Sequence, residues 1–452
     1  MSAPDVRAAL ARGVGRAARL SGHGGTSLPG KVMLRMDRGA IARLGRSLPE
    51  GCVLVSATNG KTTSAALAAA VLERAGIAVV HNVAGANMAG GVAAALLGRD
   101  RGAQLGLFEV DEFWLAEIAA ALEPRAILLG NLFRDQLDRY GELETIGARW
   151  AALAEGTDAT LVLNADDPLI ADLGRRREGS VYFGLEDPGA ATGEPLAHAA
   201  DSTHCANCGA AYRYRHVYLA HLGDYQCPGC GRTRPAPAVA ARAVALDGMP
   251  GASFALRTPG GELGVRTALP GLYNVYNALG AAALATALGV APATIAQGLG
   301  GAAAVFGRGE LVRIGERELS ILLIKNPAGA NEVLRLLGAQ DGRHDVLAIL
   351  NDEIADGRDV SWIWDADIET LAPHIGTLTC SGTRAAEMAL RFKYAGVETG
   401  RIAVEPSLEV ALDAALARSA ERLFALPTYT AMLALRRLLA RRGHAASSWA
   451  RA

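Results

Sequence analysis

A short apolar run that leads into a glycine–lysine–threonine turn is the feature that most constrains the fold. Residues 51–57 read GCVLVSA, a valine-rich stretch bounded by glycine, which is typical of a buried parallel strand. Residues 58–63 read TNGKTT, and the alanine-rich stretch after them favours a helix that closes at Gly76. A strand, a tight turn and a helix in this order predict a phosphate-binding loop.

The residue types in this loop indicate how it would hold a nucleotide. Gly60 lets the backbone approach a phosphate, and the N–H groups at the helix start cradle the anion. Lys61 can reach the β- and γ-phosphate oxygens, and the hydroxyl of Thr62 or Thr63 can bind Mg²⁺, with Thr62 as the predicted ligand. An ordinary Walker loop would have glycine where Val55 stands, so an ordinary strand–helix turn with a surface lysine is the alternative. The predicted nucleotide-binding residues of the loop are Thr58, Asn59, Gly60, Lys61, Thr62 and Thr63.

Strands and helices then alternate along the chain. Further apolar runs predict strands at 77–80, 105–110, 126–129 and 160–163, with helical segments between them. This alternation predicts a doubly wound α/β sheet, which binds ligands at the carboxyl ends of its strands.

Three carboxylates end the run at 105–110: Glu109, Asp111 and Glu112. Carboxylates at this edge suit Mg²⁺, which takes one or two of them and keeps several waters. We predict Glu109 as the magnesium ligand because it follows the buried run most directly. A solvated acidic turn is the alternative interpretation.

The later part of the chain has a different organisation. The helical period disappears from about residue 186 to 265, which indicates an insertion, and it returns in an alanine-rich helix at 273–288. A glycine-rich stretch at 298–309 is interpreted as a linker. A second α/β unit follows, with strands expected at 320–324, 346–350, 377–380, 402–404 and 423–425. The predicted division is an N-terminal helical segment at 1–45, a P-loop domain at 46–300 and a Rossmann-like α/β domain at 310–452.

Four cysteines within the irregular region form two CxxC pairs. Cys205 and Cys208 are separated from Cys227 and Cys230 by 18 residues, a spacing typical of a structural zinc ribbon at about 201–234. Two redox disulfides or an iron–sulfur site are the alternatives. Four thiolates complete a tetrahedron, so the nearby histidines are expected at the surface and not on the metal. These histidines are His204, His216 and His221. The other two cysteines, Cys52 and Cys380, lie in apolar runs and are expected in the core.

Composition limits the partners and the location of the protein. Lys plus Arg number 45 and Asp plus Glu number 46, so no global field favours nucleic acid, and none is expected as a partner. No apolar stretch is long enough to span a membrane, and the N-terminus lacks the apolar region of a secretory signal. We therefore expect a cytoplasmic protein. An amphipathic N-terminal helix with Val6, Leu10, Val14 and Leu20 on one face could pack on the domain behind it or lie on a membrane surface.

Several motifs resemble those of the Mur ligases and folylpolyglutamate synthases. Residues 57–63 (ATNGKTT) resemble their TNGKT loop, and residues 131–142 (NLFRDQLDRYGE) resemble their N-x-x-x-D-x-x-D segment. Residues 272–278 (LYNVYNA) resemble the helix start near the adenine, and 325–329 (KNPAG) resemble an H-N-P segment with lysine in place of histidine. The resemblance implies ATP and Mg²⁺, and it adds Asn131, Asn274, Asn277 and Asn326 to the predicted nucleotide-binding residues.

A narrower resemblance is carried by the ribbon, by residues 325–332 (KNPAGANE) and by residues 351–365 (NDEIADGRDVSWIWD). Over roughly residues 25–440 the chain resembles the MurT family, the ligase-like subunits of lipid II isoglutaminyl synthases. The resemblance implies a Mur-ligase-like P-loop middle domain with an inserted four-cysteine zinc ribbon and a Rossmann-like C-terminal domain. It also implies a glutamine amidotransferase partner, GatD, and membrane-bound lipid II as substrate, with peripheral contact at the inner face of the membrane.

The implied reaction is amidation of the α-carboxyl of D-glutamate in the lipid II stem peptide. ATP would phosphorylate the carboxyl, and ammonia from the partner would displace phosphate to leave D-isoglutamine. The resemblance assigns Asp359 as the acid that completes the partner's Cys–His pair, with Asp356 as the nearest competitor. A stand-alone Mur- or folylpolyglutamate-type ligase, and a catalytically silent scaffold that only activates an amidotransferase, are the alternative functions.

Overall fold

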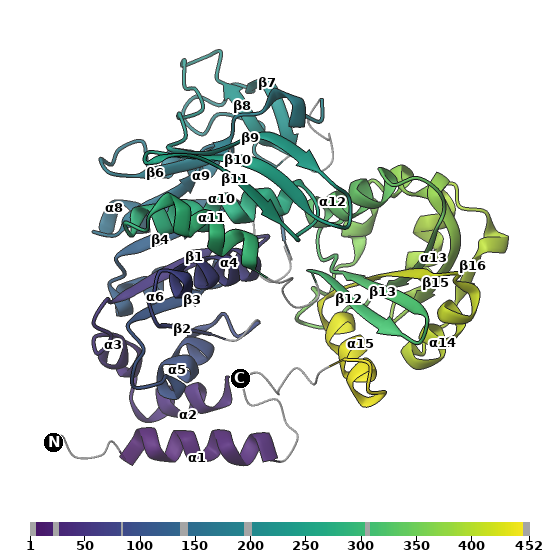
Figure 1. Cartoon of the computed structure of the whole chain (residues 1–452), viewed down its shortest axis with the longest axis horizontal. Helices are drawn as coiled ribbons and strands as arrows, with labels where there is room; N and C mark the ends of the chain where they lie inside the picture. Colours follow the sequence, from purple (N-terminus) through teal and green to yellow (C-terminus); the bar gives the residue numbers. More distant parts are fainter. Residues whose placement is uncertain are drawn as a thin grey trace.

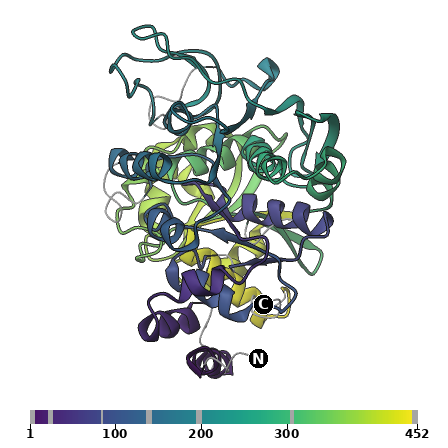
Figure 2. The same ribbon diagram turned by 90° about the vertical axis from the view of Figure 1, so that its left-hand side faces the viewer.

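The computed structural model describes residues 6–20, 27–82, 85–135, 143–193, 201–302 and 308–445. Two α/β lobes lie side by side, and a small two-stranded hairpin lies at the edge of the larger lobe (Figure 1). The predicted α/β class is confirmed. Seen from the side, the hairpin region and the N-terminal helix α1 lie at opposite ends of the larger lobe (Figure 2).

The larger lobe is built on a nine-stranded sheet with the order β11-β10-β9-β6-β5-β4-β1-β3-β2. Its pairs from β2 to β9 are parallel, whereas β9, β10 and β11 pair antiparallel at one edge. The strands are β1 (Cys52–Ser56), β2 (Val79–His81), β3 (Leu105–Glu109), β4 (Ala126–Leu129), β5 (Thr160–Asn164), β6 (Val181–Leu185), β9 (Val239–Leu246), β10 (Ala252–Thr258) and β11 (Gly261–Thr267).

Helices cover both faces of this sheet because successive side chains of a strand point to opposite sides. Val53 and Val55 of β1 pack into one core cluster with α4, α10 and α11, and Leu54 packs into the other with α5, α6 and α8. The helices of this lobe are α1 (Val6–Leu20), α2 (Leu28–Met36), α3 (Ala40–Gly45), α4 (Lys61–Arg74), α5 (Ala89–Gly98), α6 (Leu115–Leu122), α8 (Leu143–Gly156), α9 (Pro168–Leu173), α10 (Leu272–Ala287) and α11 (Pro292–Gly301).

The smaller lobe is built on a six-stranded sheet with the order β12-β13-β17-β14-β15-β16. Only the β12–β13 pair is antiparallel. The strands are β12 (Arg308–Ile314), β13 (Arg317–Leu322), β14 (His344–Ile349), β15 (Ile375–Ser381), β16 (Ile402–Val404) and β17 (Arg422–Pro427), and the helices are α12 (Pro327–Gly338), α13 (Ala385–Tyr394), α14 (Leu408–Arg418) and α15 (Tyr429–Arg441).

The structure corrects two expectations about chain organisation. The region from 186 to 265 is not one insertion, because β9 to β11 belong to the main sheet and only the part with the cysteine pairs projects from it. That part contains the hairpin of β7 (Arg213–Leu219) and β8 (Leu222–Gln226). The stretch 298–309 is not simply a linker, because α11 extends to Gly301 and β12 begins at Arg308; residues 303–307 lie outside the described ranges.

Candidate functional site

The loop between β1 and α4 has the form that the sequence predicts. Gly60 directly precedes α4 at a φ of 85°, a left-handed conformation that favours glycine. A Cβ atom on Gly60 would lie 1.9 Å from Asn277 Oδ1, so a larger residue does not fit. The backbone therefore turns tightly before Lys61 and directs the first N–H groups of α4 toward the loop, where an anion would bind.

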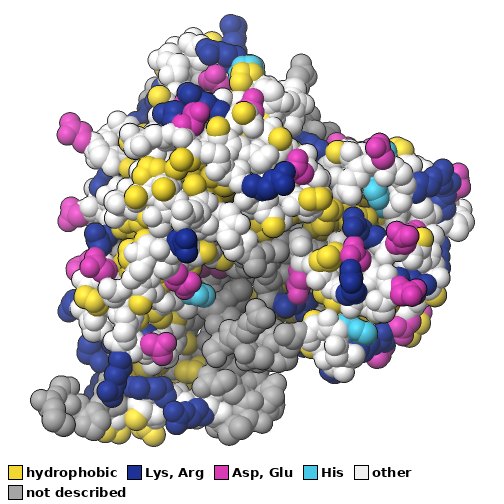
Figure 3. Space-filling view, in the orientation of Figure 1, with side chains coloured by type: hydrophobic (Ala, Val, Ile, Leu, Met, Phe, Trp, Pro, Cys, Tyr) yellow, Lys and Arg dark blue, Asp and Glu magenta, His cyan; other side chains and the backbone are white. Residues whose placement is uncertain are grey.

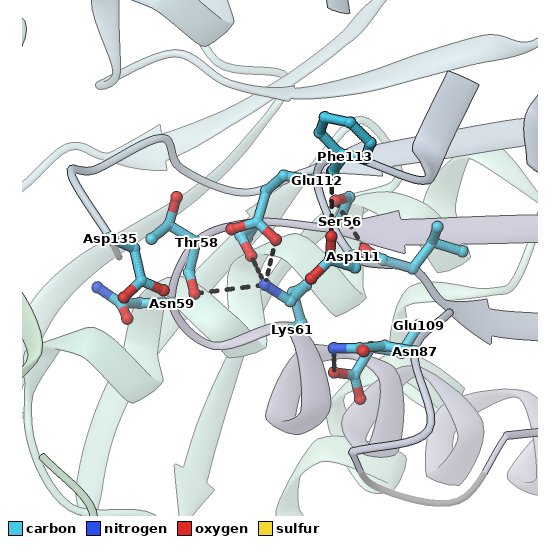
Figure 4. Close-up of polar contacts among 12 residues, drawn as sticks. Ser56, Thr58, Asn59, Lys61, Asn87, Glu109, Asp111, Glu112, Phe113 and Asp135 are labelled. Atoms are coloured by element: carbon cyan, nitrogen blue, oxygen red, sulfur yellow. Dashed lines mark hydrogen bonds and ion pairs between the residues drawn. The ribbon is translucent and has the colours of Figure 1, made fainter. Parts of the chain in front are cut away.

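Lys61 points under the loop rather than into solvent. Its Nζ donates to the Ala57 carbonyl oxygen and lies 2.7 Å from Glu112 Oε2, and the residue is only 7% exposed (Figure 4). Burial opposes the positive charge, but Glu112 and Asp111 raise the pKa of Lys61 above its ordinary value. Burial would likewise raise the pKa of Glu112, yet Lys61 and Lys325 lower it. The site therefore holds a buried ammonium–carboxylate pair.

The three carboxylates at the end of β3 and directly after it are buried, which excludes the solvated-turn interpretation. Glu109, Asp111 and Glu112 are 4%, 5% and 6% exposed. Glu112 takes the ion pair with Lys61, whereas Glu109 Oε1 accepts from Asn87 Nδ2 at 3.4 Å (Figure 4). Glu109 as the magnesium ligand stays a prediction. Nothing in the sequence singles out Glu112, because the direction of its side chain depends on the turn at 111–114.

Asparagine side chains tie the loop to its surroundings. Asn131 Oδ1 accepts from the Asn59 N–H at 2.9 Å, and Asn131 Nδ2 donates to the Asn59 carbonyl at 2.9 Å. The side chains of Asn59 and Asn326 exchange two hydrogen bonds at 3.2 and 3.0 Å. Asn326 also caps α12 through the Gly329 N–H, so this contact joins the two lobes at the start of a helix.

The two predicted asparagines of α10 differ in their positions. Asn274 is fully buried and donates to the Pro270 carbonyl at 2.7 Å, so it fixes the helix start. Asn277 Nδ2 donates to Asn274 Oδ1 at 3.0 Å, and Asn277 reaches the cleft beside Gly60. The geometry therefore brings Asn277, and not Asn274, to the cleft surface.

A cleft of about 780 Å³, open to solvent, lies between the lobes at this loop. Polar groups of the loop line one end, and the aromatic rings of Phe133, Tyr273 and Tyr276 line the wall. The smaller lobe contributes Lys325 and Glu332. Sequence reasoning did not single out Glu332, whose burial raises its pKa to about 7 although Arg335 opposes the shift.

A second cavity of about 520 Å³ lies beside Lys325 and extends to Asp359. Lys325 forms an ion pair across the lobes with Asp135. Burial raises the pKa of Asp135, and Lys325 opposes this shift. Asp135 belongs to the predicted N-x-x-x-D-x-x-D segment, whose remaining acidic positions, Asp138 and Glu142, lie outside the described residues.

The structure separates the two aspartates that compete for the partner-directed role. Asp356 is 3% exposed and accepts from the Thr430 N–H at 2.7 Å and from its hydroxyl, so it fixes the start of α15. Asp359 is exposed beside the second cavity and accepts from the nearby Ser361 N–H at 2.9 Å. Hydrogen bonds from Ser361 lower the pKa of Asp359, which keeps its carboxylate charged.

The cysteine pairs come together in one cluster. The sulfur atoms of Cys205, Cys208, Cys227 and Cys230 all lie within 4.8 Å of one another. Tetrahedral zinc with Zn–S bonds of about 2.3 Å requires sulfurs about 3.8 Å apart, so the cluster fits zinc. Gly209 and Gly231 follow the two pairs at φ of 73° and 74°, as tight turns around such ligands require. All four thiols are free, as are the buried Cys52 and Cys380.

One histidine expectation is wrong. His221 is fully buried, because the turn between β7 and β8 packs it against Phe133 and Asp167. The predicted surface position holds for His204, which is exposed, while His216 is half-buried. Of the other predicted site residues, Thr63 is buried and lines the cleft, and Thr62 is half-buried beside it.

Comparisons with known proteins place this site in a family. Residues 55–218 match the Mur ligase middle domain, and residues 323–432 match the MurT ligase C-terminal domain. The chain is 35% identical over 427 residues to the lipid II isoglutaminyl synthase (glutamine-hydrolyzing) subunit MurT of Streptococcus pneumoniae, covering 92% of this chain and 93% of that protein. The chain belongs to the MurT family. MurT of Staphylococcus aureus (strain N315) is 32% identical, with 86% of this chain and 87% of that protein covered.

Solved structures agree with the MurT assignment at the level of the fold. A pseudomurein peptide ligase type C from Methanothermus fervidus has a TM-score of 0.69 at 22% identity, with 88% of this chain and 80% of that one covered. MurF ligase from Thermotoga maritima, solved in complex with ADP, has a TM-score of 0.61 at 14% identity, with 90% and 84% covered. The predicted Mur-ligase-like architecture is confirmed. Among the described residues, no helix of this MurT-family chain is both long and apolar enough to cross a bilayer.

The cysteine cluster predicts one zinc ion per chain. Cys227→Ser replaces a buried thiolate ligand, so the variant should lose zinc to a chelator at least about tenfold more readily than the native chain. Cys380→Ala, which changes a buried cysteine of the smaller lobe, should keep its zinc. Metal content is measured by mass spectrometry on the full-length protein. Iron in place of zinc, or equal retention in both variants, would contradict the assignment.

The raised pKa of Glu332 predicts how the stability of the chain depends on pH. A carboxyl whose folded-state pKa is about 7 binds its proton more tightly when folded, so stability falls as pH rises from about 4.5 through about 7. Glu332→Gln lacks this cost, and the variant should gain up to about 3 kcal/mol relative to the native chain between about pH 5 and pH 8. Denaturant midpoints of the variant and the native chain, at about pH 5 and at about pH 8, measure this gain in stability. Glu387→Gln, at a partly exposed glutamate paired with Arg384, is the control, and equal behaviour of the two variants would refute the prediction.

Proposed function

We propose that this chain is the ATP-dependent ligase subunit of a lipid II isoglutaminyl synthase. It amidates the α-carboxyl of D-glutamate in the lipid II stem peptide with ammonia supplied by a GatD-like glutamine amidotransferase. The observation that carries the proposal is the buried Lys61–Glu112 pair beneath a phosphate loop, in a chain that matches MurT proteins over nearly its whole length. The domain boundaries near residues 46, 300 and 310 are part of the same proposal.

The chemistry requires activation of the carboxyl because a carboxylate and ammonia do not condense in water. The carboxylate oxygen attacks the γ-phosphorus of ATP, ADP leaves, and an acyl phosphate forms. Ammonia then attacks the acyl carbon, inorganic phosphate leaves with the C–O bond electrons, and a proton is lost to give the amide. Such phosphoryl transfer depends on positioning and charge neutralisation.

The residues of this chain match those two requirements. The N–H groups after Gly60 and the Lys61 ammonium would hold the β- and γ-phosphates, and Thr62 with Glu109 or Glu112 would hold Mg²⁺. Tyr273 and Tyr276 line the apolar wall on which a base could stack. Lys325, beside the phosphate loop and on the side of the second cavity, would face the acyl phosphate from the smaller lobe.

Asp359 fits the role of the acid that acts on the partner. Its carboxylate is exposed and charged, whereas the Asp356 carboxylate is committed to Thr430. A carboxylate that reaches the partner's histidine would fix the tautomer of that histidine and stabilise its charged form. Trp364, which is 49% exposed on the same loop, offers an aromatic anchor for the partner.

The stand-alone ligase is the weaker candidate. A UDP-N-acetylmuramoylalanine–D-glutamate ligase from Aromatoleum aromaticum is 31% identical, but the match covers only 50% of this chain and 46% of that protein. The MurT proteins also match the part of the smaller lobe that carries Asp359. That region favours an amidating subunit over an amino-acid ligase.

An amidation assay tests the proposal. The chain with lipid II, ATP, Mg²⁺ and ammonium should yield a product lighter by about 1 Da, and Lys61→Ala should lower the rate by about 10²–10³-fold because it removes a phosphate-binding charge. Product detected with an amino acid donor and not with ammonium would favour the stand-alone ligase. Activity unaffected by Lys61→Ala would favour the silent-scaffold alternative.

The same assay with the partner distinguishes the two aspartates. Asp359→Asn should lower the glutamine-dependent rate by about 10²–10⁴-fold and leave the ammonium-dependent rate within about twofold. Asp356→Asn should instead lower the unfolding midpoint, because it removes the carboxylate that holds Thr430. A selective loss of the glutamine-dependent rate in Asp356→Asn would transfer the role to Asp356.

Peripheral contact with the membrane is part of the proposed function. Val6, Leu10 and Val14 are 67%, 57% and 36% exposed at four-residue spacing on α1, and Arg7, Arg12 and Arg16 are exposed on the same helix. Apolar and basic side chains adjoin at this end of the molecule (Figure 3). Such a helix suits an anionic bilayer that carries lipid II.

Vesicle sedimentation measures this contact. Vesicles with phosphatidylglycerol should retain the native chain, and replacement of Val6, Leu10 and Val14 by serine should weaken retention by about fivefold or more. The control replaces Val404 and Val410, which are similarly exposed on the smaller lobe. Equal retention of both variants would show that α1 does not dock on lipid.

A further inference from the structure

The segment 131–135, which follows β4, connects the phosphate loop to the smaller lobe. Asn131 bonds both backbone groups of Asn59, and the Phe133 N–H donates to Thr58 Oγ1 at 3.0 Å. Two residues further on, Asp135 holds Lys325 of the smaller lobe. The segment has no helix or strand of its own, so its position depends on these side-chain contacts.

The cysteine-rich ribbon holds the opposite side of the same segment. Asp201 Oδ2 accepts from the Arg134 N–H at 2.9 Å, and Asp201 Oδ1 accepts from Arg134 Nε. The Asp201 side chain is only 6% exposed. The Arg134 side chain is 42% exposed, so the contact lies at the surface, but its charge-assisted hydrogen bond is stronger than a neutral one.

His221 adds a second contact from the ribbon. Its Nδ1 accepts from the Asp201 N–H at 3.3 Å, its Nε2 lies 3.4 Å from Asp167 Oδ2, and its ring centroid lies 4.7 Å from that of Phe133. Asp167 Oδ2 in turn accepts from the Leu132 N–H at 2.9 Å. The fully buried imidazole therefore contacts Phe133 directly and Leu132 through Asp167.

The ribbon fold places these two residues. The hydroxyl of Tyr214 in β7 shares its one hydrogen between the Ser202 carbonyl oxygen at 3.3 Å and the His221 carbonyl oxygen at 2.9 Å. The Tyr212 N–H donates to the Thr203 carbonyl at 2.8 Å, next to the first cysteine pair. The chain before Cys205 and the β7–β8 turn are thus held together by the same small unit that carries the four thiols.

We propose that Asp201 and His221 are positioning residues of the nucleotide site. They hold segment 131–135 in place, and this segment holds Thr58 and Asn59 of the phosphate loop. Metal binding by the ribbon and nucleotide binding by the loop are then coupled, so each strengthens the other. The inference rests on the proposed function, because it requires that the loop bind a nucleotide.

ADP affinity of the full-length chain tests the coupling, with isothermal titration calorimetry as the measurement. Asp201→Ala should raise the Kd for ADP by about tenfold, while its zinc content and unfolding midpoint stay those of the native chain. Asp224→Ala is the matched control, because Asp224 is also a ribbon aspartate paired with an arginine, Arg215, at 3.4 Å, but away from the segment. Its Kd should stay within about twofold of the native value.

A double-mutant cycle with Arg134→Ala separates positioning from general destabilisation. Asp201→Ala removes both contacts with Arg134, whereas Arg134→Ala removes only the one from Nε and keeps the backbone N–H donor. The double variant should therefore bind ADP about as well as Asp201→Ala alone. Asp201→Asn keeps an acceptor for the Arg134 N–H and should recover part of the affinity. Additive effects of the two alanine substitutions would overturn the direct coupling between the two residues.

Removal of the metal provides a second readout, and it keeps His221 testable if its variants fold poorly. A chelator should weaken ADP binding to the native chain, and zinc should restore it, with a smaller change in Asp201→Ala. His221→Gln, where folded, should behave like Asp201→Ala. If the native chain does not bind ADP, the proposed function fails. If the native chain binds ADP, and both Asp201→Ala and the metal-free chain bind ADP as well as the native chain does, only the positioning inference is overturned.

Discussion

A buried positive charge is the constraint on which the site depends. Lys61 is 7% exposed at the first turn of α4, and an unpaired ammonium there would be strongly destabilising. Glu112 and the Ala57 carbonyl satisfy it. Glu112 can do so only because β3 lies next to β1 in parallel register, with Val55 opposite Glu109. The sheet order, as much as the loop, therefore determines which acid meets the lysine.

In the proposed function, the same pair would link phosphate binding to a divalent cation. A phosphate that takes the Lys61 ammonium leaves the Glu112 carboxylate buried without its partner. A cation that binds the Glu112 carboxylate leaves the Lys61 ammonium buried without its partner. Joint entry of phosphate and Mg²⁺ keeps both charges balanced, which is the usual form in which ATP is bound. The contacts from the smaller lobe, Asn326 and Lys325, meet the larger lobe beside this charge pair.

Local signals in the sequence were sufficient for much of the fold and for part of the site. The valine-rich run of β1 and Gly60 depend on their own residues, as do the CxxC pairs, and each is where the pattern placed it. The strands β9 to β11 were not recognised, because the loss of helical period there reflects antiparallel strands at the sheet edge. The available signal was the alternation of residue types in β10, where the buried positions include Ala252, Phe254 and Leu256.

Residues whose surroundings come from distant parts of the chain could not be placed in this way. His221 is buried by Phe133 and Asp167, which lie far from it in sequence, and nothing near His221 indicates this. The choice between Glu109 and Glu112 depends on how the chain bends after β3. The choice between Asp356 and Asp359 depends on Thr430, which only the fold brings near. The sequence therefore predicted candidate chemistry better than it predicted contacts.

The size of the ribbon explains why metal binding would support its contacts with the larger lobe. Its own core consists of a few residues, Cys205, Tyr212, Tyr225 and Cys227, packed against Ala171 of α9, whereas the hairpin tip packs into the core of the larger lobe through Tyr218, Leu219, Ala220 and Leu222. A core this small contributes little hydrophobic stability, so metal binding would supply much of the folding free energy. The ribbon also leaves and rejoins the sheet between β6 and β9, which are adjacent parallel strands. A unit fixed at both ends and stabilised by metal can hold segment 131–135 more rigidly than a flexible loop could.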